Sequence, residues 1–459
     1  MRLVVVGAGI AGLVAAYEAR TIAGRTGIDL HTTILEAEPR AGGKLFTEHE
    51  GGTALEWGPD SFLASKPAAR ELAEVLGLEL VQQLPESMRA FLLLDGDLRP
   101  FPPGLVMGVP RGPTGVMGAV RSGIVGAASA ARVAVEPMLP GRWIRAAIDK
   151  LLEETDRDES AARVVRRRLG RSWSSRVVEP LLEGVYGAPA EQLGVRATLP
   201  QFALARSLVL AARRTPPAQE PMFLSIRGGM GRLAERIEES LQDADLRLRT
   251  PALAVSRRDG AFSVAIPDGE IEADAIILAV PAPAARGLIQ QIAPSVAGEL
   301  GAIRFSSSAV VLLRYEPGAL GSAPDGSGYL VPRREGLMHA ACSWLTSKWP
   351  GEGADVWLRA IVTSPVRLRD DDAAIGDLVA TEVDSVMHMT TGPAEVRVHR
   401  WEHALPVYAP GHLERVDRIE AGLPARIALA GASYRGLGVP DCIASGRRAA
   451  ARLTEAART

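Results

Sequence analysis

The hydrophobic pattern at the start of the chain predicts a strand, a glycine turn, a helix and a second strand. Residues 2–6 form an apolar, β-branched run, and Leu13 to Ala23 repeat apolar residues at helical spacing. Residues 32–36 then predict a second strand, which ends in Glu36. Because a helix joins two short buried strands, a parallel βαβ unit is the natural assembly.

Helical and strand patterns alternate through the next part of the chain. Residues 71–82 predict a helix that ends at Gly77, and residues 88–94 predict a strand that a turn at Asp95-Gly96 folds into a hairpin. From residue 140 to residue 214 the pattern is mainly helical. The helical segments predicted there are Trp143–Glu154, the basic stretch Arg163–Arg168, which we expect to form a solvated face, and Trp173–Leu182.

The second half of the chain returns to strands. Gly228 to Met230 open a helix over 232–241, and a strand is predicted behind it over 246–255. Residues 261–280 predict two strands that extend the first sheet, joined by a turn at 268–269. Residues 305–402 alternate at period two in several places, which predicts a second, largely antiparallel sheet.

The last residues of the chain predict a second strand–loop–helix unit. Residues 426–431 read as a buried strand, residues 432–438 as a glycine-punctuated loop, and a helix begins at Pro440. A helix N-terminus carries a partial positive charge. If a flavin lies there, this charge stabilises the reduced, anionic ring, as a hydride acceptor requires.

Composition and charge exclude several classes of protein. The net charge of -2 gives no overall field for a polyanion, so nucleic-acid binding is not expected. The two cysteines, Cys342 and Cys442, are a hundred residues apart without a metal-ligand spacing, which speaks against a disulfide scaffold and a metal site and favours a reducing, cytoplasmic location. The apolar run Leu3–Val6 is too short for a signal sequence, and charges interrupt the tract Gly104–Pro140, so no transmembrane segment is expected. Peripheral membrane contact stays open.

The glycine turn has the spacing that dinucleotide binding requires. Gly7 permits a tight turn, Gly9 lets the backbone approach a pyrophosphate, and Gly12 lets the helix pack closely against the strand. Glu36 follows Gly12 at about the distance expected for an acid that binds a ribose hydroxyl. Two further glycines, Gly42 and Gly43, follow the second strand and imply a backbone that passes close to something flat or charged.

These motifs together resemble the FAD-containing amine oxidase superfamily, and within it the protoporphyrinogen and coproporphyrinogen oxidases. The resemblance spans nearly the whole chain. It rests on Val4–Gly12, Glu36, Gly42-Gly43-Lys44, Gly58–Leu63, Pro180–Gly187, Gly228–Met230, Ser347–Pro350, Ala430–Gly438 and Asp441–Ile443. The chain departs from the family's pattern at Gly187-Ala188-Pro189, where we expect the loop to differ in shape.

The resemblance implies an α/β fold with a Rossmann-type FAD-binding domain, a mixed-sheet substrate domain and a helical subdomain. The implied ranges are 1–75, 222–292 and 405–459 for the FAD-binding domain, 76–104, 196–221 and 293–404 for the substrate-binding domain, and 105–195 for the helical subdomain. The implied FAD contacts are Gly7, Ala8, Gly9, Ile10, Ala11, Gly12, Glu36, Ala37, Gly43, Lys44, Gly58, Pro59, Asp60, Ser61, Ala252, Trp401, Gly436, Leu437 and Gly438. Ala252 replaces the family's usual Val.

The family's substrate contacts fall on two positions of this sequence. Arg89 matches an arginine that pairs with a propionate, and Leu330 matches an apolar residue that packs on the macrocycle. Lys66 is a second candidate for a propionate, judged from its place after the cofactor loop, and Trp344 is a weaker guess. No His, Glu or Asp pair is identified as a catalytic base, so flavin N5 as hydride acceptor is the only catalytic group expected.

The implied reaction is the six-electron oxidation of coproporphyrinogen III to coproporphyrin III in haem biosynthesis, with O₂ as acceptor and hydrogen peroxide as product. The resemblance also implies a transient contact with a ferrochelatase-type enzyme. Protoporphyrinogen IX is the alternative substrate. A polyamine or monoamine oxidase, a carotenoid desaturase and a non-enzymatic flavoprotein stay open as other classes, although only 5% of the chain is aromatic, which is low for an amine-binding aromatic cage.

Overall fold

The computed structural model describes residues 1–138, 158–216, 221–258, 260–319, 325–351, 353–363 and 367–456. The predicted helix Trp143–Glu154 lies outside these residues. The chain divides into two units, each with its own core. The first comprises Met1–Gln82, Glu220–Arg304 and Leu413–Thr459, and the second comprises Gln83–Gln219 and Phe305–His412. The described parts of the predicted helical subdomain, 105–138 and 158–195, belong to the second unit.

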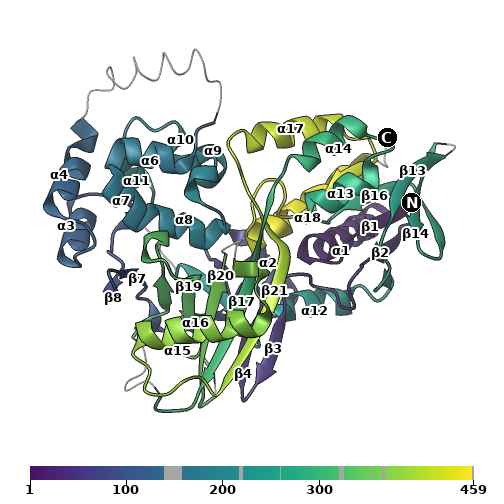
Figure 1. Ribbon diagram of the computed structural model, residues 1–459. Coiled ribbons are helices and arrows are strands. Elements are labelled where there is room, and N and C mark those ends of the chain that lie inside the picture. Colours follow the sequence, from purple (N-terminus) through teal and green to yellow (C-terminus); the bar gives the residue numbers. More distant parts are fainter. Residues whose placement is uncertain are drawn as a thin grey trace. The chain divides into compact units, whose positions relative to one another are not determined.

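A parallel sheet of five strands forms the centre of the first unit (Figure 1). Its order is β12 (Asp245–Arg247), β2 (His31–Leu35), β1 (Arg2–Val6), β16 (Ala275–Leu278) and β22 (Ile427–Leu429). Every neighbouring pair is parallel. The central strand β1 and its neighbour β16 are apolar on both faces because both faces are covered, and this explains their hydrophobic runs.

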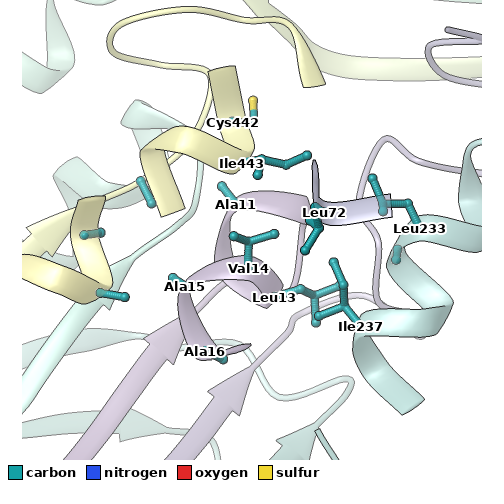
Figure 2. Packing of buried hydrophobic residues seen from close by; sticks show 14 of the residues in the cluster. Ala11, Leu13, Val14, Ala15, Ala16, Leu72, Leu233, Ile237, Cys442 and Ile443 are labelled. Atoms are coloured by element: carbon teal, nitrogen blue, oxygen red, sulfur yellow. The ribbon is translucent and has the colours of Figure 1, made fainter. Parts of the chain in front are cut away.

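Helix α1 (Ile10–Thr26) packs against the C-terminal helix α18 (Val439–Ala456). Its buried residues are mostly small, and Figure 2 shows Ala11 next to Cys442 and Ile443. A Cβ at Gly446 would lie 2.4 Å from the carbonyl oxygen of Ala11, so a glycine is required at this crossing. Small residues thus allow the two helices that follow β1 and β22 to lie in direct contact.

The remaining elements of the first unit surround this core. They are β3 (Thr47–Glu50), β4 (Thr53–Glu56), β5 (Phe62–Leu63), α2 (Pro67–Val75), β6 (Leu80–Gln82), β11 (Phe223–Ile226), α12 (Gly231–Ser240), β13 (Ala254–Arg258), β14 (Ala261–Ile266), β15 (Gly269–Ala273), α13 (Ala282–Ile289), α14 (Pro294–Gly301) and most of α17 (His412–Gly422).

Three predictions for the first unit are wrong in part. The helix predicted over 71–82 begins earlier, at Pro67, and residues 80–82 form strand β6. The strand predicted over 246–255 is two strands, because Pro251 has no N–H to continue a ladder. Of the strands formed by residues 254–278, β16 joins the parallel sheet, whereas β13, β14 and β15 form a separate antiparallel sheet.

The second unit contains the predicted, largely antiparallel sheet. Its order is β21 (Glu395–Pro406), β17 (Phe305–Tyr315), β20 (Val356–Val362), β19 (His339–Trp344), β18 (Gly328–Leu330), β7 (Phe91–Leu94) and β8 (Asp97–Pro100). Neighbours are antiparallel except β18 and β7. The β7–β8 hairpin turns at Asp95-Gly96 as predicted, with both residues at positive φ.

Side chains alternate between two hydrophobic clusters on the two faces of this sheet. In β7, Leu93 belongs to one cluster, together with residues of helix α16 (Asp372–Met387), whereas Leu92 and Leu94 belong to the other, together with the helices of 113–214. In β18, Tyr329 and Leu330 are divided in the same way. Period-two alternation therefore decides which layer each strand residue contacts.

Helices and short strands of the second unit complete its layers. They are η1 (Pro85–Ser87), β9 (Leu105–Val106), β10 (Val109–Pro110), α3 (Pro113–Arg121), α4 (Ala127–Val135), η2 (Glu136–Met138), α6 (Ala161–Leu169), α7 (Arg171–Trp173), the π-helical η3 (Ser174–Val178), α8 (Glu179–Tyr186), η4 (Ala190–Gln192), α9 (Val195–Thr198), α10 (Pro200–Ala203), α11 (Leu208–Arg214), η5 (Arg333–Glu335), α15 (Leu345–Lys348) and η6 (Arg367–Arg369).

The arginine stretch is less solvated than its charge predicts. Arg168 is buried and its Nη1 lies 3.9 Å from the carboxylate of buried Glu136. Arg167 makes two hydrogen bonds of 2.8 Å to Glu159, and Arg166 binds Glu179 and Glu191. The prediction of a solvated face is therefore wrong for Arg168, and these carboxylates offset much of the local positive charge. In the described part of the chain, no helix has the length and apolar character needed to cross a membrane.

Candidate functional site

The glycine turn between β1 and α1 combines two closed positions with one open position. A Cβ at Gly7, which has φ +101°, would lie 2.8 Å from the carbonyl oxygen of Ala279, and a Cβ at Gly12 would lie 1.9 Å from the carbonyl oxygen of Gly7. At Gly9 no atom lies within 4 Å of an added Cβ. Packing of the protein itself explains Gly7 and Gly12, whereas Gly9 borders space that a ligand can enter.

The start of α1 is suited to an anion. Its N-cap, Gly9, has no side chain to accept hydrogen bonds from the first turn, so those N–H groups and the helix dipole face a ligand without competition. Ala8, Ile10 and Ala11 complete this turn, and Ala8 and Ala11 are buried. The arrangement fits the pyrophosphate of a dinucleotide.

Glu36 lies beside this turn at the carboxyl end of β2. One carboxylate oxygen, Oε2, accepts a 2.7 Å hydrogen bond from the backbone N–H of Ala8, and Oε1 accepts one of 3.0 Å from Glu38. Two backbone donors thus fix the carboxylate next to the glycine turn, where a ribose hydroxyl is expected. Ala37 follows directly in the chain.

The segment Gly42-Gly43-Lys44 lies against the glycine turn. The N–H of Gly42 donates to the carbonyl of Ala8 over 2.8 Å, and a Cβ at Gly43 would lie 3.1 Å from Cα of Gly9. Both glycines have positive φ. Close approach of two backbones therefore explains the glycine pair.

Lys44 is largely removed from water, and this lowers the pKa of its ammonium group. No carboxylate in the described chain opposes this shift or accepts a hydrogen bond from Lys44. A desolvated cation without an acidic partner is costly. An anionic ligand at this position would remove that cost, which agrees with the predicted FAD contact.

Residues 58–61 are tied to the same region. A Cβ at Gly58 would lie 1.7 Å from the carbonyl oxygen of Lys44, so only glycine fits there. Asp60 is buried, its Oδ1 accepts from Ser61 Oγ over 2.9 Å, and its carbonyl accepts from Ser225 over 2.8 Å. Pro59 lies between the two. The predicted residues of the first three motifs are thus gathered at one end of the parallel sheet.

The C-terminal loop lies at the same end of the sheet, where the parallel strands have their carboxyl ends. Strands β1 and β22 are both parallel to β16. Helices α1 and α18, which follow these two strands, therefore begin at the same end of the sheet. A Cβ at Gly436 would lie 2.5 Å from Cγ of Asp441, and the N–H of Gly438 donates to Oδ2 of Asp441 over 3.3 Å. Asp441 in the first turn of α18 therefore shapes the loop that contains Leu437.

For two predicted residues of the first unit, Ala252 and Lys66, the contacts within the chain do not by themselves indicate a ligand. Ala252 lies between β12 and β13, near Thr250, whose N–H donates to the carbonyl of Glu36 over 2.7 Å. Lys66 is in an ion pair, with Nζ 2.7 Å from both carboxylate oxygens of Asp441. Sequence reasoning missed Asp441 as the partner of Lys66. The spacing of the two in the chain, 375 residues, gave no signal.

The other predicted residues belong to the second unit. Trp401, in β21, contacts His399 edge to face at 4.3 Å between ring centroids. Arg89 donates to Asp325 over 2.6 Å, with both side chains more than half exposed. Leu330 is half-buried beside α8, since a Cβ at Gly184 would lie 3.0 Å from its Cδ2.

Trp344 is buried, and its indole N–H has no hydrogen-bond partner in the described structure. It lies in β19 next to β18, and its ring contacts Phe91 and Tyr329. Core packing accounts for these contacts, so the weaker guess that Trp344 contacts substrate gains no support from them.

Comparison with known proteins identifies the family. A model described as flavin-containing amine oxidoreductase matches residues 10–454. The chain belongs to this family. The predicted resemblance, the FAD cofactor and an oxidase activity are thereby confirmed.

Individual members of the flavin amine oxidoreductase family align over almost the full length of this chain. A coproporphyrinogen III oxidase of Mycobacterium leprae is 33% identical over 467 residues, covering 99% of this chain and 98% of the relative. One of Bacillus subtilis is 30% identical over 471 residues, covering 97% and 96%. A crystal structure from Exiguobacterium sp. 255-15, named as a candidate protoporphyrinogen oxidase, is 32% identical with a TM-score of 0.86 and covers 99% of both chains. A putrescine oxidase variant, 18% identical with a TM-score of 0.70 over 100% and 99% of the two chains, shares the fold.

The residues of the first unit fit the FAD of this family. A dinucleotide explains the open position at Gly9, the uncapped start of α1, the half-buried carboxylate of Glu36 and the desolvated Lys44. A metal is not needed to explain them. In the described residues, no three His, Cys, Asp or Glu side chains are grouped to hold one.

Sequence reasoning missed Glu183 in the second unit. This acid interrupts the apolar segment Pro180–Val185 and is buried, and burial raises its pKa to about 7. Nε of Arg333 donates to its Oε2 over 3.1 Å. An acid inside an apolar helix was the only available signal.

Proposed function

We propose that this flavin oxidase converts coproporphyrinogen III to coproporphyrin III in haem biosynthesis, with O₂ as electron acceptor. The observation that carries the proposal is the near full-length identity of 30 to 33% to coproporphyrinogen III oxidases from two bacterial genera. Protoporphyrinogen IX is the second candidate substrate, because the Exiguobacterium structure carries that enzyme's name.

The chemistry removes six hydrogens from the macrocycle. Bound FAD supplies a two-electron acceptor that O₂ reoxidises. Each of three rounds removes one hydride from a bridge carbon and one proton from nitrogen. Tautomerisation moves one further hydrogen from the remaining bridge to nitrogen, so that the bridges lose four hydrogens in all and the pyrrole nitrogens lose two. The six hydrogens leave as three molecules of hydrogen peroxide, so three molecules of O₂ are consumed.

The residues of the chain bind and orient the reactants. Glu36, Lys44 and the turn Gly7–Gly12 would hold FAD, together with the loops around Gly58 and Gly436. Arg89 and Lys66 would bind propionates, and Leu330 would contact the macrocycle. Their contribution to the rate is orientation of a reactive bridge carbon, since pyrrole protons can be released without a dedicated base.

Electrostatics favours coproporphyrinogen III over protoporphyrinogen IX. The first carries four propionates and the second carries two, so a site with several cations gains more from the first. A cytoplasmic location and a transient contact with a ferrochelatase-type enzyme, which would take the product for iron insertion, complete the proposal.

One assay tests the proposal directly. Purified holoenzyme is incubated in air with coproporphyrinogen III, protoporphyrinogen IX or a polyamine, while porphyrin fluorescence and peroxide are followed. We expect three peroxides for each coproporphyrin III formed and a lower kcat/KM for protoporphyrinogen IX. A preference for the polyamine, or a higher kcat/KM for protoporphyrinogen IX, would contradict the proposal.

A further inference from the structure

A buried carboxyl and an exposed guanidinium meet beside Leu330. Nε of Arg333 donates to Oε2 of Glu183 over 3.1 Å, and the two side chains are 58% and 11% exposed. Glu183 lies on α8 directly before Gly184, whose added Cβ would lie 3.0 Å from Leu330. Arg333 follows Leu330 by three residues. The pair therefore adjoins the residue predicted to contact the macrocycle.

The contact uses only one edge of the guanidinium. Nε of Arg333 binds Glu183, and in the described part of the chain its two Nη groups have no hydrogen-bond or ion-pair partner. The Nη groups form a planar fork that matches the two oxygens of a carboxylate. Glu183 thus fixes the orientation of a guanidinium whose fork is free to bind a ligand.

The charge balance around Glu183 leaves the pair partly cationic near neutral pH. The pKa of Glu183 is raised to about 7, first by burial and then by the nearby Glu191 and Glu179, while Arg333 and the N–H of Ala190 oppose the shift. The packed strands β18 and β19 contain no Asp, Glu, Lys or Arg, and Arg176 of η3 contacts Asp95 instead. With Glu183 protonated, the pair carries a full positive charge.

We propose that Arg333 binds a carboxylate of the porphyrinogen substrate and that Glu183 is the positioning residue that holds its guanidinium. This inference rests on the proposed function, and it adds a third cation to Arg89 and Lys66. A substrate with four propionates needs such additional partners. Arg333 therefore contributes to the preference for coproporphyrinogen III.

The test compares Arg333→Ala with a matched control in the same 3-10 helix. Arg334 pairs with Asp95 and Glu335 instead of Glu183, so Arg334→Ala removes the same charge without touching the pair. We expect Arg333→Ala to raise KM for coproporphyrinogen III roughly three- to tenfold with kcat changed less than about twofold. The Kd of coproporphyrin III, measured by fluorescence, should rise by a similar factor.

Glu183→Gln tests the positioning role. Glutamine can still accept the hydrogen bond from Nε but carries no charge. KM of the wild type for coproporphyrinogen III should rise between pH 6 and pH 8.5 as Glu183 ionises, and the rise should be absent or reduced in the Gln variant. Melting temperature and FAD content confirm that both variants are folded.

The outcomes separate the inference from the proposed function. If Arg333→Ala and Arg334→Ala have equal KM and Kd values in an active enzyme, the assignment of Arg333 is wrong. If the wild type and Glu183→Gln show the same pH dependence of KM, the role of Glu183 is wrong. A wild-type holoenzyme that oxidises neither porphyrinogen contradicts the proposed function instead.

Discussion

Lys66 and Asp441 form an ion pair in which Nζ lies 2.7 Å from both carboxylate oxygens. Lys66 is the N-cap residue of α2, and Asp441 lies in the first turn of α18 and accepts from the N–H of Gly438. One ion pair thus connects the starts of two helices and the loop predicted to contact FAD. An ammonium group has three donors, so Lys66 can bind a propionate while it stays in contact with Asp441.

Lys66→Ala should raise KM for coproporphyrinogen III roughly three- to tenfold with little change in kcat, because it removes a cation proposed to bind a propionate. Stability should fall by less than about 1 kcal/mol, since the lysine side chain is 46% exposed. Steady-state kinetics and thermal melting provide both measurements.

Arg447→Ala is the matched control for this prediction. Arg447 on α18 donates to Glu71 of α2 over 3.0 Å, so it connects the same two helices without facing the glycine loop. Its removal should change stability by a similar amount and leave KM unchanged. An equal rise of KM in both variants would mean that Lys66 acts only through helix packing.

Gly9→Ala and Gly12→Ala should separate ligand binding from folding. Gly9 has φ -66°, which alanine adopts readily, and its added Cβ meets no atom within 4 Å, so the apoprotein should be unchanged in stability within about 0.5 kcal/mol. FAD should bind more than about tenfold more weakly, because the Cβ occupies the space of the pyrophosphate. Gly12→Ala should cost roughly 2 to 4 kcal/mol of folding free energy, as its Cβ would lie 1.9 Å from an oxygen.

Apoprotein melting curves and FAD titration by flavin fluorescence measure these two effects. Unchanged FAD affinity in a folded Gly9→Ala protein would remove the glycine turn from the cofactor site.

Glu36→Ala should weaken FAD binding more than it changes turnover of the remaining holoenzyme, because a ribose contact is remote from the reacting ring. Glu36→Gln should weaken binding less, since an amide oxygen can still accept from the N–H of Ala8. Titration of apoprotein with FAD and kcat per bound flavin test this order. A loss of kcat per flavin without a loss of affinity would contradict it.

Arg89→Ala should raise KM for coproporphyrinogen III and leave stability almost unchanged. The ion pair with Asp325 is worth less than about 1 kcal/mol, because both partners are more than half exposed. Asp325→Ala is the control, since it removes the same ion pair but keeps the cation, and KM should stay the same or fall. If both substitutions raise KM equally, the ion pair rather than the arginine matters for binding.

Glu183 should make the free energy of unfolding depend on pH. Its pKa is raised from 4.5 in the unfolded chain to about 7, so between these values the folded protein keeps a proton that the unfolded chain releases. Stability from this group is therefore complete below about pH 4.5 and declines as the pH rises to about 7. Glu183→Gln should gain melting temperature relative to the wild type as the pH is raised from 5 to 8.

Glu395→Gln is the control for this prediction, because the pKa of Glu395 is shifted in the opposite direction to that of Glu183. Hydrogen bonds from Arg397 and Arg314 lower the pKa of Glu395, so its contribution is present above about pH 4.5 and is lost on acidification. The Gln variant should be less stable than the wild type at pH 7, and the difference should shrink in acid. Parallel pH profiles for both Gln variants would contradict the assigned pKa shifts.

Local sequence patterns predicted those elements whose formation depends on residues close together in the chain. The strand–turn–helix of residues 2–26, the β7–β8 hairpin and the C-terminal strand–loop–helix each follow from hydrophobic spacing and glycine positions that lie close together in the chain. The prediction of one strand over 246–255 was wrong, because it followed the apolar residues of the segment and neglected the missing N–H of Pro251. Which sheet the strands at 254–273 join depends on partners outside the segment, and spacing carries no such information.

The sequence by itself determined the first strand–turn–helix unit and the flavin family, and it predicted Gly9 and Glu36 as cofactor contacts, because glycine spacing and an acid after the second strand are local requirements of a dinucleotide. Only the tertiary structure decided which charges meet. Lys66 and Asp441 are 375 residues apart, and Glu183 and Arg333 are 150 apart, so no pattern along the chain connects them. The raised pKa of Glu183 is likewise a result of the tertiary structure. Desolvation depends on all the groups packed around a side chain and not on its neighbours in sequence.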